Sequence, residues 1–153
     1  MEPLYHNDYI LLAKVNYTHT LSMTNIEVGE YSVLFTKKNI YLLKYYAVIG
    51  GLKEDECKYD GLNAPAVFYK FTNDTKDAAS LDSAASALTR KYVGIEINIS
   101  ELTKFVIKNG WFTRGIHMKA YGNSPLKYNR TVVFKGKETG IKLLEFYRDM
   151  IKQ

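Results

Sequence analysis

Apolar and polar side chains alternate along several stretches of the chain. Residues 9–22 place Leu11, Ala13, Val15 and Tyr17 on one face of an extended segment and Lys, Asn, Thr and Ser on the other. Further stretches of this kind are residues 31–36, 40–48, 92–100, 104–108, 116–121 and 129–135. A period of two is typical of a β-strand with one buried and one solvated face. The pattern therefore predicts about seven antiparallel strands.

The last segment has a helical period instead. Between residues 139 and 152 the apolar side chains fall in one broad stripe, and charged side chains cover the opposite side. The stripe consists of Leu143, Leu144, Phe146, Tyr147, Met150 and Ile151. Burying such a side chain stabilises the fold by about 1.5 to 3 kcal/mol. We expect this helix to close the open end of a bent sheet.

The alternation weakens between about residues 50 and 91. Residues 67–71 have the composition of a short strand, whereas residues 73–88 are rich in Asp, Ala and Ser and have a weak helical period. Asp77 is a candidate helix cap there. No linker separates two cores, so we interpret residues 1–153 as a single domain with an insertion at about 50–91.

The order of these elements resembles the pleckstrin-homology (PH) superfold. Residues 29–43, which read GEYSVLFTKKNIYLL, are similar to the opening hairpin of GRAM-like and bacterial PH-like domains. Residues 95–102 resemble the strand that leads to the Gly-Trp turn there, and residues 132–144 resemble the last strand and the helix. The resemblance implies an α+β, mainly β fold: a bent sheet or partly open barrel capped by a C-terminal helix. A lipocalin-like or cone-shaped α+β fold is the alternative architecture.

Phosphoinositide binding is what a PH resemblance first implies. Headgroup sites of that family use Lys and Arg in the first hairpin link, where cations converge on phosphates. The corresponding residues 23–30 contain two Glu and neither Lys nor Arg. The sequence therefore argues against a headgroup site at this link.

Composition and charge limit which compartment and which class of partner the sequence allows. The lone Cys57 cannot form an internal disulfide, and no stretch is long and apolar enough for a signal peptide or a membrane span. We predict a cytoplasmic protein without a transmembrane segment. The net charge is +5, but the basic residues are scattered in blocks of at most two. This scatter argues against a nucleic-acid partner, which is the third hypothesis, and an anionic lipid surface ranks behind a protein partner.

No combination of residues indicates catalysis. His6, His19 and His117 are far apart and have no metal-ligand spacing, and Cys57 lacks a nearby histidine. The pair Gly50 and Gly51 lacks the remaining residues of a phosphate-binding loop. We predict no enzyme activity, no cofactor and no metal site.

The predicted partner-binding residues are Trp111, Phe112, Arg114, Lys37 and Lys38. The two aromatic residues fall at a hairpin tip, where they could enter a partner's pocket or a membrane interface. The more frequent fate of a tryptophan is packing into the core, and this stays the alternative for Trp111. We predict a non-catalytic binding module for a protein partner, and the alternative function is a small-ligand carrier or enzyme with a pocket inside a wider barrel.

Overall fold

The computed structural model describes residues 2–20, 26–49, 52–120 and 128–152. The strands are β1 (Leu4–Tyr5), β2 (Tyr9–Thr20), β3 (Ile26–Thr36), β4 (Asn39–Ile49), β5 (Leu52–Glu56), β6 (Ile95–Asn98), β7 (Leu102–Asn109), β8 (Arg114–Ala120) and β9 (Tyr128–Val133). The α-helices are α1 (Ala64–Asp74), α2 (Leu81–Lys91) and α3 (Lys137–Phe146). The 3-10 helices are η1 (Ala78–Ser80), η2 (Ile99–Glu101) and η3 (Arg148–Met150).

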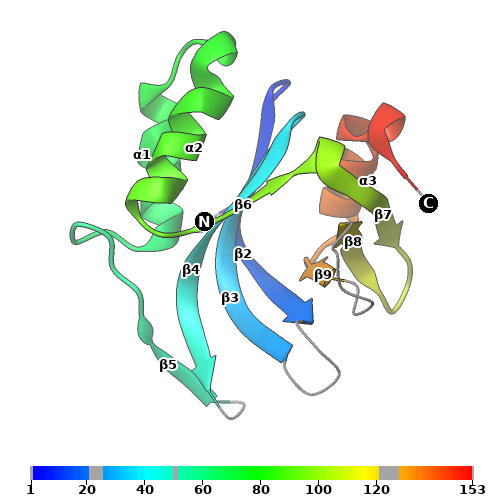
Figure 1. Ribbon diagram of the computed structural model, residues 1–153, viewed down its shortest axis with the longest axis horizontal. Helices are drawn as coiled ribbons and strands as arrows, with labels where there is room; N and C mark the ends of the chain where they lie inside the picture. Colours follow the sequence, from blue (N-terminus) through cyan, green and yellow to red (C-terminus); the bar gives the residue numbers. More distant parts are fainter. Residues whose placement is uncertain (1, 21–25, 50–51, 121–127, 153) are drawn as a thin grey trace.

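The strands pair antiparallel in one sheet of order β5-β4-β3-β2-β9-β8-β7. In addition β1 pairs with β2, and β6 pairs with the start of β4. Among the described residues no pairing between β6 and β7 closes the sheet into a barrel. Figure 1 shows α1 and α2 on one side of strands β2 to β4 and α3 on the other. The predicted fold class, a bent antiparallel sheet with a C-terminal helix, is confirmed.

A β-bulge bends β2 and changes which side chains face inward. The register between β2 and β3 shifts between Leu12 and Val15. Leu12, Val15 and Tyr17 belong to the inner cluster, whereas Leu11 packs in a separate cluster on the outer face. The prediction that Leu11 shares a face with Val15 and Tyr17 is wrong, because the extra residue of a bulge shifts the alternation by one position.

The inner core lies between the bent sheet and α3. Leu143 and Phe146 of α3, and Tyr147 directly after it, are buried there. The ring of Tyr147 meets Phe105 of β7 edge-on at 4.9 Å, and its hydroxyl donates to the carbonyl of Thr36 at 2.7 Å. The predicted stripe therefore packs against both halves of the sheet, as expected for a closing helix.

A second core lies on the outer face of the same strands. Leu11 from β2, Leu34 from β3, and Tyr41 and Leu43 from β4 are fully buried against the helices. Helix α1 contributes Ala64, Val67 and Phe68, and α2 contributes Ala85. The insertion between β4 and β6 thus adds the edge strand β5 and a helical layer that covers one half of the sheet.

The predicted strand at residues 67–71 is wrong, because these residues lie in α1. The helix begins at a capped end: the Asn63 side chain accepts a hydrogen bond from the amide of Ala66 at 3.0 Å, and Pro65 occupies the first turn. A cap followed by proline is a common helix start. Val67 and Phe68 are buried on its inner face with Ala64.

Helix α2 ends where the sequence pattern predicted a strand. Val93, with φ +53°, follows the last turn; its amide donates to Arg90, and the amide of Gly94 donates to Thr89. This pair of bonds is a Schellman motif, in which glycine usually takes the left-handed position. The strand β6 therefore starts at Ile95, whereas the sequence pattern predicted a start at residue 92.

Candidate binding surfaces

The β7–β8 hairpin presents two large aromatic side chains to solvent. Trp111 is 86% exposed and Phe112 is 95% exposed. The turn itself is held by a hydrogen bond from the Gly110 amide to the Thr113 carbonyl at 2.9 Å. The expectation that Trp111 packs into the core is wrong. Exposed aromatic residues on an ordered turn are a typical feature of recognition surfaces.

Asn109 ties this tip to the start of α3. Its side-chain oxygen accepts from Nε of Arg114 at 3.1 Å, and its nitrogen donates to the carbonyl of Lys137 at 3.1 Å. Arg114 is therefore partly buried and supports the base of the tip. We define the aromatic tip as Trp111 and Phe112 on this base.

Lys37 lies at the other end of α3. Its ammonium donates to the carbonyl of Phe146 and stands 3.8 Å from the centre of the Phe146 ring. Arg114 is instead linked through Asn109 to the first residue of the helix, and ten residues of α-helix span about 15 Å. The structure thus separates Lys37 from Arg114, and the predicted binding residues do not form one site. In Figure 1 the β3–β4 turn points to the top and the β7–β8 turn lies below the middle.

Lys38 is exposed and lines a groove of about 540 Å³ with Lys37 and Lys152. Lys152 donates to three carbonyls, those of Ile99, Ser100 and Leu102, at 3.1 to 3.4 Å. Two of the three cations are therefore engaged by backbone carbonyls. The groove does not offer a converging set of cations for an anion.

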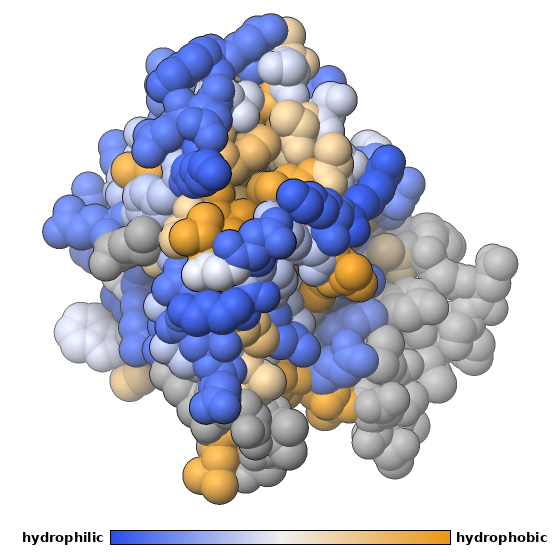
Figure 2. Space-filling model, turned by 90° about the vertical axis from the view of Figure 1, so that its left-hand side faces the viewer, coloured by the Kyte–Doolittle hydropathy of each residue, from blue (hydrophilic) through white to orange (hydrophobic). Residues whose placement is uncertain are grey.

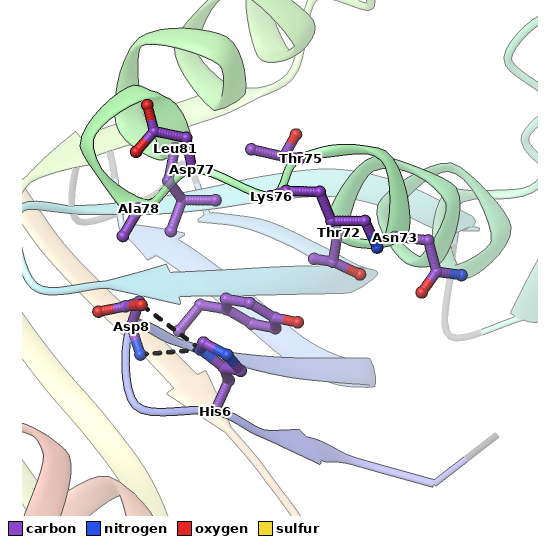
Figure 3. Close-up of a pocket in the computed structure, with 10 residues that line it drawn as sticks. His6, Asp8, Thr72, Asn73, Thr75, Lys76, Asp77, Ala78 and Leu81 are labelled. Carbon is purple, nitrogen blue, oxygen red and sulfur yellow. Dashed lines mark hydrogen bonds and ion pairs between the residues drawn. The ribbon is translucent and has the colours of Figure 1, made fainter.

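Two further hollows surround the helical layer. The first, of about 220 Å³, lies between the β1–β2 turn and the residues that follow α1. Figure 3 shows His6 and Asp8 facing Thr72 and Lys76 across it; His6 is 3.7 Å from the Asp8 carboxylate and stacks on Tyr9. Thr72 is buried, but the side chains of His6 and Asp8 are about half exposed, so their contact is an ordinary surface pair.

The second hollow, of about 340 Å³, lies between α1 and α2. Val67, Phe71 and Leu88 form its apolar part, while Asp60 and Lys91 pair at 3.4 Å on its rim. Figure 2 shows this side of the molecule, with hydrophobic surface near the middle and hydrophilic residues around it. The groove lies between two helices that each pack on the sheet.

The buried titratable groups of the inner face lie near one edge of the core. Arg130 donates to the hydroxyl of Tyr17, and burial raises the pKa of Tyr17. Burial and Arg130 lower the pKa of His19, which is on the same face. The hydrogen bond to Tyr17 engages the Arg130 guanidinium within the protein. The described residues contain no group of three potential metal ligands, and no helix among them is long and apolar enough to cross a membrane.

Comparison with protein-family models, curated proteins and solved structures gives no match for this chain. The PH-like family assignment therefore stays a prediction, carried by the sequence resemblance and compatible with the fold. Strand pairing defines one further surface. Lys104 and Lys108 lie on β7, His117 and Lys119 lie on β8, and the pairing of these two strands brings the four side chains to one outward face.

Proposed function

We propose that this chain is a non-catalytic binding module that recognises a protein partner with its aromatic tip. The observation that carries the proposal is the exposure of Trp111 and Phe112 on an ordered hairpin. Neither side chain is needed by the inner or the outer core. Trp and Arg are enriched among the residues that dominate protein interfaces, and Arg114 supports the tip from below.

The tip has the geometry of an anchor. Turn residues 110–113 protrude from a hairpin whose base is fixed to α3 through Asn109, so little ordering is required on docking. Pre-ordered side chains lose less conformational entropy when they bind. A hydrophobic pocket on a partner would accept both rings together.

Site-specific photo-crosslinking tests the proposal. A photoreactive phenylalanine analogue replaces Phe112 in one variant and Val93 in a control variant; both positions are more than 90% exposed, and Val93 lies at the end of α2. In cells that express the chain we expect one dominant crosslinked protein from position 112 and none from position 93. That protein is then purified and titrated against the chain.

A second substitution separates the anchor from a chance contact. Trp111→Ala should weaken the titrated affinity by about 30-fold or more, the loss of about 2 kcal/mol that a central aromatic anchor carries. An affinity unchanged by Trp111→Ala, or equal crosslinking from positions 93 and 112, would contradict the proposal.

An anionic membrane surface is the second candidate for the tip. The Phe134 amide donates to the Arg114 carbonyl at 3.3 Å, which holds the segment after β9 beside the tip. Lys135 and Lys137 in this segment are exposed. Aromatic residues near cations suit the interface of an anionic bilayer. Trp111 is the only tryptophan of the chain, so its emission reports directly on insertion. A shift to shorter wavelength with phosphatidylserine vesicles would favour this candidate over a protein.

The carrier or enzyme alternative has less support from the fold. It requires an interior pocket, whereas the concave side of the sheet is filled by the buried residues of the inner core. Such a pocket would need buried polar side chains, and the best candidates are Tyr17 and His19. The hydroxyl of Tyr17 already accepts a hydrogen bond from Arg130. The packed interior favours the binding module.

A further inference from the structure

One half of the outer sheet face is not covered by a helix. The α1–α2 layer packs on the outward side chains of β2, β3 and β4, such as Leu11, Leu34 and Leu43. The outward side chains of β7, β8, β9 and the end of β2 have no such layer among the described residues. We call this surface the open face. Val133 on it is 40% exposed and Val28 at its margin is 51% exposed.

The strand register places the residues of the open face in rows. One row contains Thr20, Asn129, Lys119 and Lys104; the next contains Thr18, Thr131, His117 and Val106; the third contains Asn16, Val133, Gly115 and Lys108. Directly paired residues of an antiparallel sheet share a face. The alternation of buried Phe105, Ile107, Ile116 and Met118 on the other side confirms which face is outward.

The cations of the open face stand close together. Lys104 pairs directly with Lys119 in register, which places their Cβ atoms about 5 Å apart. Lys108 is four residues along the same strand from Lys104, or about 13 Å. Like charges directly opposite on a sheet are destabilising. An unmatched pair of this kind suggests that the face meets an external anion.

His117 lies between these lysines, opposite Val106. Burial, Lys108 and Lys104 lower its pKa, so the imidazole gives up its proton more readily than a free histidine does. Its Nε2 atom is buried and has no hydrogen-bond partner among the described residues. The pKa of the imidazole therefore depends on the positive charge of the neighbouring lysines.

No acidic side chain of the described rows balances the lysines. Glu30 of β3 lies beside Asn16, but it is largely buried and pairs with Lys14 at 3.3 Å. The other outward residues are mainly Thr and Asn. Hydroxyl and amide groups interspersed with lysines are the side chains that contact phosphate oxygens in nucleic-acid complexes.

We infer that the open face binds the phosphodiester backbone of a single-stranded nucleic acid through Lys104, Lys108 and Lys119. The scattered basic residues of the sequence argued against such a partner, and the register is the observation that changes this view. The inference concerns a surface different from the aromatic tip and does not depend on the proposed protein partner.

The shape of the face selects the kind of anion. The open face of the bent sheet carries no helix that could enter a groove of a duplex, whereas a flexible single strand can follow it. A bilayer would require apolar side chains that reach beyond the cations, but on this face the lysines are longer than Val106 and Val133. Contacts to the backbone alone predict binding without sequence preference.

Fluorescence anisotropy with labelled oligo(dT) of 20 nucleotides tests the inference, with the binding constant measured between 50 and 200 mM salt. Three phosphate contacts on a single strand predict a slope of log K against log salt of about −2, or about 20-fold weaker binding at the higher salt. In Lys104→Gln/Lys119→Gln we expect a slope of about −0.7, since one contact remains.

The matched control is Lys70→Gln/Lys76→Gln, which removes the same charge from exposed positions near the helical layer. Its slope should equal that of the parent protein. If the first pair does not fold by circular dichroism, Lys108→Gln serves instead, because its cross-strand neighbour is Gly115 and it should reduce the slope by about 0.7.

Three results would overturn the inference: no binding of the oligonucleotide at 50 mM salt, equal loss in both double variants, or tighter binding to a duplex of the same length. Phosphatidylserine vesicles form a separate arm. Vesicle binding that depends on Lys104 and Lys119, without oligonucleotide binding, would assign the open face to a membrane. Photo-crosslinking at position 112 can succeed or fail independently of each of these results.

Discussion

The hydroxyl of Tyr41 donates to the carboxylate of Asp82 at 2.7 Å and joins the helical layer to the sheet. Thr36 donates to the same carboxylate oxygen at 2.5 Å, and the carbonyl of Thr36 accepts from Tyr147. A single carboxylate on α2 is thus connected through one residue of the β3–β4 hairpin to the closing segment. Burial and then the Asp82 hydrogen bond raise the pKa of Tyr41.

Asp82→Ala should lower the free energy of unfolding by about 1 to 3 kcal/mol. The substitution removes the carboxylate that both hydroxyls share and leaves them only the longer contacts to the backbone carbonyls of Asp82 and Asn39, at 3.1 and 3.2 Å, and weakened hydrogen bonding of buried polar groups is costly. Urea unfolding followed by circular dichroism measures the effect. Asp74→Ala, at the exposed end of α1, is the control and should change the free energy by less than about 0.5 kcal/mol.

Phe68→Ala should destabilise the protein by about 3 to 5 kcal/mol, because a fully buried aromatic ring is removed from the outer core. Phe112→Ala makes the same chemical change at an exposed position and should have almost no effect on the same unfolding curve. Equal midpoints for the two variants would mean that the helical layer contributes nothing to global stability.

Val93→Gly should stabilise the fold by about 0.5 to 1 kcal/mol. The left-handed conformation costs an L-residue roughly 1 to 2 kcal/mol, and the greater chain entropy of glycine offsets part of that gain. Gly94→Ala should act in the opposite direction, since a Cβ there would lie 2.6 Å from the carbonyl oxygen of Leu42. Thermal unfolding of both variants checks the two signs together.

The pKa of His117 should lie below 6.5, and NMR titration of its imidazole resonances measures it. Because the folded-state pKa is lowered, the associated stability is present above pH 6.5 and is lost as the pH falls through the folded-state pKa. Lys104→Gln or Lys108→Gln should raise the pKa by removing a nearby positive charge. An unchanged value in both variants would show that the lysines do not act on this ring.

Alternation of side chains was sufficient to predict most strands, because a half-buried strand repeats every two residues. It failed at the bulge of β2, where the position of Leu11 depends on the partner strand. It also failed at residues 67–71, although Asn63 followed by Pro65 is a helix start that the sequence contains. Periodicity could not separate a short helix from a short strand here.

The candidate surfaces were harder to predict. Trp111 could be placed on a tip, but its exposure depends on whether neighbouring elements leave room for the ring. Lys104 and Lys119 are 15 positions apart, and their juxtaposition follows from one register of β7 against β8. Lys37 was predicted to be available for binding, whereas the end of α3 engages it.

Strands β3 and β4 are enclosed from both sides, which has a consequence for misfolding. If the α1–α2 layer detached while the sheet persisted, Leu11, Leu34 and Leu43 would form a bare apolar wall. Such walls on neighbouring molecules adhere to each other, so the partly opened form would be prone to self-association. By covering these side chains the insertion should limit aggregation, and shortening it should reduce the yield of monomer on refolding.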